Sequence, residues 1–299
     1  GSRERVGADI IHENPYNIKG EGFTAAMWDG GWAGNHQDLN HSLGWSEKLI
    51  IGDKDNCDLS DYSGYECGVQ NHPTMVAGTM AGGGDILEDL TGIAPESRGI
   101  TFDFPSPENT VSDLLSETEV AIENYDSVVS QNSWGYDNYE SILGEYTGLS
   151  AVYDNMTRGD AGFGPASYVF SVGNEQDDFS FNYNTTIGPG GTSKNTISVG
   201  GVWENGNMTS FSSWGPTDDG RIKPELVAKG INVTSTYPGD IYSTMKGTSF
   251  SAPAVSGLVV LLNQAYNSSF GTLPQPSMVK ALLIHSAQDI FDRGPDYKS

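Results

Sequence analysis

Short apolar segments that end abruptly in glycine or a polar residue most strongly limit what this chain can fold into. Residues 23–28 are mostly apolar and are followed at once by Asp29, Gly30 and Gly31. An apolar run of this length, closed by a turn, predicts a buried strand with a carboxylate at its carboxyl end. The same pattern recurs at residues 128–131, 168–172 and 196–199, so the sequence predicts several buried strands that each end at a turn.

Helix-like stretches separate these strands. Apolar side chains recur at helical spacing in residues 111–125 and 281–290, and another helix is expected at or just after Ser249, with Pro253 in its first turn. Alternating strands and helices predict an α/β fold with a mostly parallel central sheet and helices on both faces. Ligands of such sheets bind beyond the carboxyl ends of the strands, where Asp29 and Asn174 are expected.

The composition indicates one acidic globular domain over residues 1–299. The 38 glycines and 14 prolines suit a chain rich in turns, and the sequence contains no internal repeat or linker. With 39 Asp and Glu against 15 Lys and Arg, the net charge is −24, which argues against nucleic acid as a partner. The acidic surface suits a salty habitat, or it attracts cationic stretches of a peptide substrate.

The cysteines and the hydropathy bear on the compartment. Cys57 and Cys67 lie close together in a loop-like segment, where a local disulfide, formed in an oxidising compartment, and two free thiols are the alternatives. No apolar run reaches about 18 residues, so we expect no membrane span. Gly1 and Ser2 look like an expression scar, and any signal peptide or propeptide is expected to have been removed before them.

Four residues match the requirements of acyl transfer to a serine. The reaction needs a hydroxyl nucleophile, a base for its proton, a carboxylate that orients the base, and donors for the oxyanion. Residue types suited to these four tasks stand at Ser249, His72, Asp29 and Asn174. Each also has a structural interpretation, as an N-cap, a helix-start histidine, a strand-end acid or a turn residue. Their occurrence together favours the catalytic interpretation.

The segments around these residues resemble the subtilisin-like family of serine proteases over nearly the whole chain. The matching segments are residues 20–22, 29–31, 36–39, 72–79, 92–96, 133–135, 171–175, 211–216, 223–225 and 247–253. The last of them, Gly-Thr-Ser-Phe-Ser-Ala-Pro, is the most specific. The order Asp, His, Ser along the chain is also that of subtilisin, and it differs from the order in chymotrypsin and the α/β-hydrolases.

The resemblance implies a three-layer subtilisin-like fold and a secreted endopeptidase that works through an acyl-enzyme on Ser249. His72 would be the general base and acid, Asp29 would orient it, and Asn174 would lie in the oxyanion hole with the backbone N–H of Ser249. An extended peptide substrate would pair with the chain as an added strand. The substrate-binding residues implied are Ser133, Trp134, Gly135, Ser171, Val172 and Gly173. A packing role is the alternative for the tryptophan.

The chain departs from the family pattern at several positions. Pro73 and Met75 stand where the family usually has glycine and a second histidine. Glu225 replaces a usual aspartate, and Lys229 replaces a usual proline. Family members normally continue beyond the point where this sequence stops, with a glycine-containing segment and a last helix. We therefore expect a hydrophobic face to be uncovered if that segment is absent.

Calcium in a structural role is the cofactor that the resemblance suggests, since the chemistry itself needs none. Four acidic residues near the cysteines offer the oxygen ligands that a hard cation requires: Asp53, Asp55, Asp58 and Asp61. Their spacing does not match an EF-hand loop, and a solvated acidic loop is the alternative.

Two other functions fit the same motifs. A peptide ligase or macrocyclase would form the same acyl-enzyme and resolve it with an amine instead of water. An inactive homologue would act as a binding module, although all four positions hold competent residue types.

Overall fold

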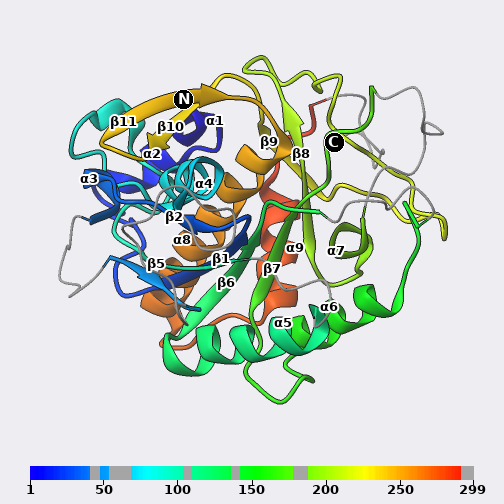
Figure 1. Cartoon of the computed structure of the whole chain (residues 1–299). Helices are drawn as coiled ribbons and strands as arrows, with labels where there is room; N and C mark the ends of the chain where they lie inside the picture. The colour runs from blue at the N-terminus through cyan, green and yellow to red at the C-terminus, as the bar shows by residue number, and fades with distance from the viewer. Residues whose placement is uncertain (41–47, 54–68, 104–109, 136–141, 178–187, 291–299) are drawn as a thin grey trace.

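A seven-stranded sheet with the strand order β3-β5-β1-β6-β7-β8-β9 forms the centre of the molecule, and all of its pairings are parallel (Figure 1). The computed structural model describes residues 1–40, 48–53, 69–103, 110–135, 142–177 and 188–290. The strands of the central sheet are β1 (Thr24–Asp29), β3 (Leu49–Ile51), β5 (Arg98–Asp103), β6 (Ser127–Asn132), β7 (Ser167–Ser171), β8 (Ile197–Val202) and β9 (Leu226–Lys229). Two small sheets pair β2 (Trp32–Ala33) with β4 (Val69–Gln70) and β10 (Val233–Tyr237) with β11 (Ile241–Met245).

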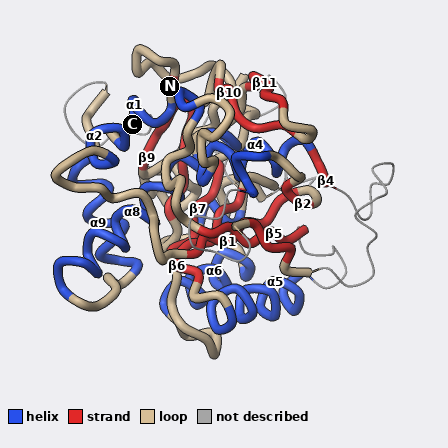
Figure 2. The backbone as a smooth tube through the Cα atoms, turned by 90° about the vertical axis from the view of Figure 1, so that its left-hand side faces the viewer, coloured by secondary structure: helices blue, strands red, loops and turns tan. Residues whose placement is uncertain are grey.

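Helices cover both faces of the sheet, which confirms the predicted three-layer α/β fold. The α-helices are α1 (Ser2–Arg5), α2 (Ala8–His12), α3 (Gln37–Asn40), α4 (Asn71–Ala81), α5 (Thr110–Glu119), α6 (Gly148–Arg158), α7 (Pro189–Thr192), α8 (Ala252–Phe270) and α9 (Pro276–Ser286). Short 3-10 turns are η1 (Glu88–Leu90) and η3 (Thr248–Phe250), and η2 (Val120–Asn124) is π-helical. Figure 2 shows α5 and α6 together on one side of the sheet.

Strand β1 shows why its sequence is continuously apolar. Ala25 and Met27 point into a core cluster that contains the buried residues of α4 and α8. Ala26 and Trp28 point to the opposite face, where the Trp28 ring stacks on Phe102 of β5 at a centroid distance of 4.7 Å. Because successive side chains of a strand alternate between faces and both faces are covered by helices, every residue of β1 is buried.

Two predicted boundaries were wrong. The strand expected to end before the glycines after residue 199 continues through Gly200 and Gly201 to the end of β8. A Cβ at Gly200 would lie 3.1 Å from both Pro224 and the Ser212 hydroxyl oxygen, so this glycine allows close approach of neighbouring chain instead of making a turn. The helix expected at 281–290 is α9, which ends at Ser286.

The carboxyl edge of the sheet gathers the polar strand ends named in the sequence. Asp29 is the last residue of β1, and Asn174 follows shortly after β7. Helix α4 begins beside them, and η3 leads into α8.

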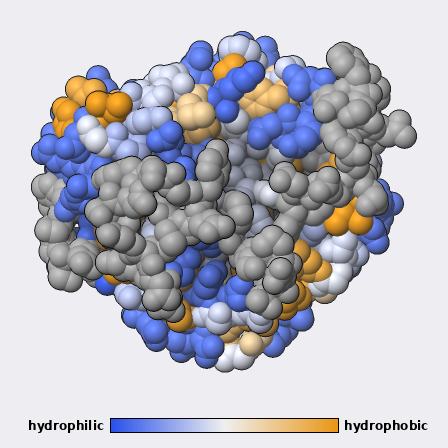
Figure 3. All heavy atoms as spheres, in the orientation of Figure 1, coloured by the Kyte–Doolittle hydropathy of each residue, from blue (hydrophilic) through white to orange (hydrophobic). Residues whose placement is uncertain are grey.

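No helix among the described residues is both long and apolar enough to cross a bilayer. Among the described residues on the face seen in Figure 3, hydrophilic side chains are the most common, with scattered hydrophobic ones between them.

Candidate active site

Asp29 and His72 meet through a short hydrogen bond. His72 is the second residue of α4, and its Nδ1 lies 2.7 Å from Asp29 Oδ1. The same carboxylate oxygen accepts the backbone N–H of Gly30 at 2.8 Å. The Asp29 side chain is only 3% exposed, whereas the His72 side chain is 35% exposed. The carboxylate is therefore fixed in the protein, and the imidazole remains open to solvent on one side.

The carboxylate determines the proton affinity of the imidazole. Burial lowers the pKa of His72, but the charge of Asp29 and its hydrogen bond outweigh burial and raise the pKa above its ordinary value of 6.5. Because Nδ1 is engaged by Asp29, Nε2 is the nitrogen left to exchange a proton with another group.

Ser249 lies in η3 and is 9% exposed. Its Oγ donates a hydrogen bond of 3.3 Å to the carbonyl oxygen of Ser133, and Ser133 Oγ donates one of 2.7 Å to the carbonyl oxygen of Ser249. The His72 ring packs against Phe250, the residue after the serine, with ring centroids 5.4 Å apart. The structure thus places the imidazole beside the serine turn, with the hydroxyl bonded to Ser133.

A chain of buried polar side chains, which was not predicted, fixes the backbone of Ser249. Ser256 Oγ in α8 donates to Gln131 Oε1, and Gln131 Nε2 donates to Ser133 Oγ, each at 2.6 Å. Ser133 then donates to the Ser249 carbonyl. Gln131 and Ser256 are fully buried, and satisfied buried networks of this kind hold their members in one arrangement.

Asn174 is held by the residue before the serine. Its Oδ1 accepts the backbone N–H of Thr248 at 2.8 Å and the Thr248 hydroxyl at 3.1 Å. This leaves the Nδ2 end of the amide as its donor. Gly173 has a φ of +105°, a conformation that favours glycine. The sequence motif contained Thr248, but its contact with Asn174 joins segments 74 residues apart and was not predicted.

The predicted substrate-binding residues divide between the surface and the core. Gly135 is exposed, and no atom lies within 4 Å of a Cβ built on it, so its surroundings are open. Trp134 is half-buried, packs beside the Trp28 cluster and donates from Nε1 to Asn132 Oδ1 at 3.0 Å. The alternative of a packing tryptophan therefore has direct support. Ser171 ends β7, and the following Val172 is buried.

Asp53 is the one predicted calcium ligand within the described residues. Its Oδ1 accepts the indole N–H of Trp32 at 2.6 Å, and its Oδ2 accepts the backbone N–H of Asp103 at 2.9 Å. Both oxygens thus bond to N–H groups of the protein. Asp55, Asp58 and Asp61 lie outside the described residues, as do Cys57 and Cys67. Over the described ranges, no group of three or more His, Cys, Asp and Glu side chains is arranged to hold a metal ion.

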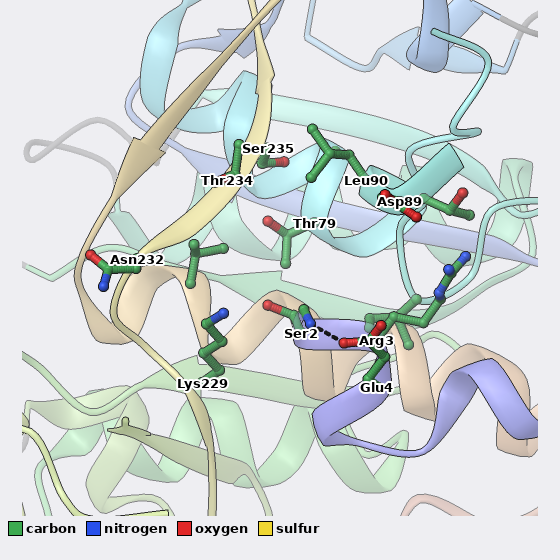
Figure 4. Close-up of a pocket in the computed structure, with 15 residues that line it drawn as sticks. Ser2, Arg3, Glu4, Thr79, Asp89, Leu90, Lys229, Asn232, Thr234 and Ser235 are labelled. Carbon is green, nitrogen blue, oxygen red and sulfur yellow. Dashed lines mark hydrogen bonds and ion pairs between the residues drawn. The ribbon is translucent and has the colours of Figure 1, made fainter. Parts of the chain in front are cut away.

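A pocket of about 100 Å³ lies apart from these residues (Figure 4). Arg3 and Glu4 of α1 line one side of it, and Thr234 and Ser235 of β10 line another. None of the predicted catalytic or substrate-binding residues contributes to its lining, so this pocket is not the site of the proposed chemistry.

Comparison with known proteins identifies the family. The sequence profile described as "Subtilase family" matches residues 20–298. The chain belongs to the subtilase family. It is 30% identical to subtilisin DY of Bacillus licheniformis over 266 aligned residues. The alignment covers 87% of this subtilase and 83% of that protein. It is 27% identical over 302 residues to cerevisin of Saccharomyces cerevisiae, covering 97% of this chain but 43% of cerevisin.

A solved structure shows the same fold. The CspB protease of Clostridium perfringens superposes on this subtilase with a TM-score of 0.78, covering 99% of this chain and 96% of that one. Sequence identity between the two is 17%, so the likeness concerns the fold alone. Family membership makes this chain a protein of the serine peptidase class.

Proposed function

We propose that this subtilase is a secreted serine endopeptidase that hydrolyses peptide bonds through an acyl-enzyme on Ser249. The observation that carries the proposal is the 2.7 Å hydrogen bond between His72 Nδ1 and the buried carboxylate of Asp29. It fixes the orientation of the ring and stabilises the imidazolium form, as a general base beside a serine requires.

In the proposed reaction, Ser249 Oγ leaves the Ser133 carbonyl by rotation about χ1 and gives its proton to His72 Nε2 as it attacks the scissile carbonyl. The imidazolium, stabilised by Asp29, then protonates the leaving amine, and the peptide C–N bond breaks. Water then gives a proton to His72 as its oxygen attacks the acyl carbon. The ester bond to Ser249 breaks, and His72 returns the proton to Ser249 Oγ. The net change is one water consumed for each peptide bond broken.

The oxyanion of the tetrahedral intermediate would be stabilised by Asn174 Nδ2 and the backbone N–H of Ser249. Anchoring of Asn174 Oδ1 by Thr248 supports this role, because a donor fixed before the reaction needs no reorganisation during it. The open surface at Gly135 supports an extended substrate alongside residues 133–135.

Labelling with a fluorophosphonate tests the proposal. We expect rapid, stoichiometric labelling of the folded protein at Ser249 and none in Ser249→Ala. Ser251→Ala is the matched control, since Ser251 lies in the same motif but donates its Oγ to the Ala228 carbonyl at 3.2 Å. Absence of labelling in folded wild-type protein, or labelling that survives Ser249→Ala, contradicts the proposal.

Product analysis separates hydrolysis from ligation. Cleavage of a peptide in H₂¹⁸O should leave one ¹⁸O in the new carboxylate for each bond broken. Cyclic or ligated products without that label would instead show that an amine resolves the acyl-enzyme.

A structural calcium ion at the acidic loop, removal of a propeptide and secretion are further parts of the proposal, and they rest on the family resemblance. The calcium prediction is tested by melting the protein with EDTA and with added Ca²⁺. Stabilisation by Ca²⁺ that is lost in Asp55→Asn and Asp58→Asn would support this site, and an unchanged melting temperature would contradict it.

A further inference from the structure

Two neighbouring carboxylates share the turn that follows β1. Strands β1 and β5 are parallel neighbours, and Asp29 stands directly opposite Asp103 in their register. Asp29 Oδ1 accepts the N–H of Gly30 at 2.8 Å, and Asp103 Oδ1 accepts the N–H of Gly31, also at 2.8 Å. The N–H groups of two successive turn residues are therefore bonded to the two carboxylates that end the neighbouring strands β1 and β5.

This turn needs such external support because of its residues. Gly31 has a φ of +88°, a left-handed conformation that glycine adopts readily but does not maintain by itself. Neither Gly30 nor Gly31 has a side chain that could pack and fix the backbone. The position of the turn therefore depends on the hydrogen bonds that its N–H groups donate.

Asp103 is itself fixed by a second carboxylate. Asp53 Oδ2 accepts the backbone N–H of Asp103 at 2.9 Å, and Asp53 Oδ1 accepts the indole N–H of Trp32 at 2.6 Å. Trp32 follows Gly31 directly and is 3% exposed. Asp53 thus bonds both to Asp103, which accepts a hydrogen bond from the turn, and to Trp32, which ends the turn.

We propose that Asp103 is a positioning residue whose carboxylate, by holding the Gly31 N–H, keeps Asp29 in the geometry that it needs to orient His72. Asp29 bonds to the same turn through Gly30, so displacement of the turn displaces the oxygen that accepts His72 Nδ1. The inference rests on the proposed function for its effect on turnover, but its effect on the imidazole does not depend on turnover.

The experiment compares Asp103→Asn, which keeps an oxygen acceptor, with Asp103→Ala, which removes it. Both lose the charge, so their difference reports the hydrogen bond. We expect the labelling rate constant of Asp103→Ala to fall by roughly tenfold, with the Asn variant within about twofold of wild type. Asp103→Ser, whose shorter side chain also withdraws the acceptor, replaces the alanine variant if that does not fold.

A second readout requires no catalysis. In a Ser249→Ala background, the ring pKa of His72 is measured by ¹H–¹⁵N NMR titration. The Asp29 carboxylate raises this pKa, so a displaced carboxylate should raise it less. We expect the titration midpoint to move to lower pH by about 0.5 in the alanine variant and to return towards the starting value in the asparagine variant.

Asp154→Ala is the matched control. Asp154 is 3% exposed and its Oδ1 accepts the backbone N–H of Asn195 at 2.7 Å, so it anchors a turn in the same way in another part of the fold. We expect it to lower stability without moving the His72 titration. An unchanged titration in Asp103→Ala, or equal effects of the Ala and Asn variants, overturns the inference. Failure of fluorophosphonate labelling in the wild type would instead overturn the proposed function and leave the NMR result to decide this inference.

Discussion

Replacing Glu225 with glutamine should destabilise the protein strongly, because this carboxylate pairs with two lysines at once. Glu225 Oε1 accepts hydrogen bonds of 2.6 Å from both Lys223 Nζ and Lys280 Nζ. Its Oε2 accepts the N–H and the hydroxyl of Ser198 at 2.8 and 2.5 Å. The Lys223 side chain is 2% exposed and that of Glu225 is 10% exposed. The group thus links α9 to β8 and to the start of β9.

The expected loss follows from the burial of Lys223. Removing one partner of a buried ion pair costs about 3–5 kcal/mol, because the other charge is left uncompensated. Burial already lowers the pKa of Lys223 to about 8 against the opposing effect of Glu225. Without the carboxylate this pKa falls further, and loss of the proton limits the cost. We therefore expect a loss of about 3 kcal/mol, at the lower end of the range.

Urea unfolding and thermal melting at pH 7 measure this loss. A loss of about 3 kcal/mol corresponds to a melting temperature lower by roughly 5 °C in a chain of this size, because the entropy of unfolding grows with chain length. The control is Asp219→Asn, which breaks the ion pair between Asp219 and Arg221. The Asp219 side chain is 45% exposed and that of Arg221 is 25% exposed. Exposed pairs contribute about 0–1 kcal/mol, so this variant should melt close to wild type.

The pH dependence provides a second check. Burial raises the pKa of Glu225, but the two ammonium groups outweigh burial and lower it to about 2 from 4.5. A lowered folded-state pKa contributes stability that is present above pH 4.5 and is lost as the pH falls towards 2. The difference between wild type and Glu225→Gln should therefore shrink over that range. A loss below about 1 kcal/mol at pH 7, or a difference that persists at pH 2, would refute the reasoning.

Three further predictions concern other sites. The acid limb of kcat/KM should lie above pH 6.5, because the neighbouring carboxylate raises the pKa of His72 and the base must be neutral; a pH–rate profile measures it. Glu117 accepts the Trp28 indole N–H at 2.8 Å, and burial raises the pKa of Glu117 from 4.5 to about 8. The stability that the protonated Glu117 contributes is therefore lost as the pH rises over that range. Glu117→Gln should therefore gain about 1–3 kcal/mol relative to wild type between pH 5 and pH 8, after allowance for partial solvation, as urea unfolding would show. Gly78→Ala should destabilise the protein by about 1–3 kcal/mol, because its Cβ would lie 2.1 Å from Thr236 Oγ1.

Each of these three has a control or a contrary outcome. An acid limb at or below pH 6.5 would show that the carboxylate does not act on the imidazole as described. Glu119→Gln, on the exposed side of α5, should leave the free energy of unfolding within about 0.5 kcal/mol of wild type. Gly148 begins α6, and no atom lies within 4 Å of a Cβ built on it. Gly148→Ala should therefore leave the free energy of unfolding within about 0.5 kcal/mol of wild type.

Apolar runs closed by a turn, which are local signals, predicted β1, β6, β7 and β8 among the seven central strands, whereas β3, β5 and β9 were not predicted. The contact between His72 and Asp29 joins residues 43 positions apart and was expected from the family resemblance. β6 and β7 lie within one residue of the predicted segments at each end. Strand β8 was cut short because its two glycines were interpreted as a turn. The sequence alone could not show that Gly200 lies against Pro224 and Ser212, which come from later segments.

The supporting contacts were not predictable for the same reason. Asp103 ends β5, a strand that was not among those predicted, and its bond to Gly31 joins residues 72 positions apart. Gln131 reaches Ser256 across 125 positions. Hydropathy and motif order identify which residues are buried or reactive, but the partner of a buried polar atom follows from sheet order and strand register, which neither signal contains.

The buried ion-pair group around Glu225 and the proposed catalytic residues lie at opposite edges of the same sheet, so the two principal tests can be separated. Glu225 precedes β9 and bonds to Ser198 near the start of β8, whereas Asp29 and Asp103 end β1 and β5. In a parallel sheet all strand ends of one kind lie at one edge. Loss of the Glu225 carboxylate should therefore reduce the folded population without changing the titration of His72, and loss of the Asp103 acceptor should change that titration even where the protein stays folded.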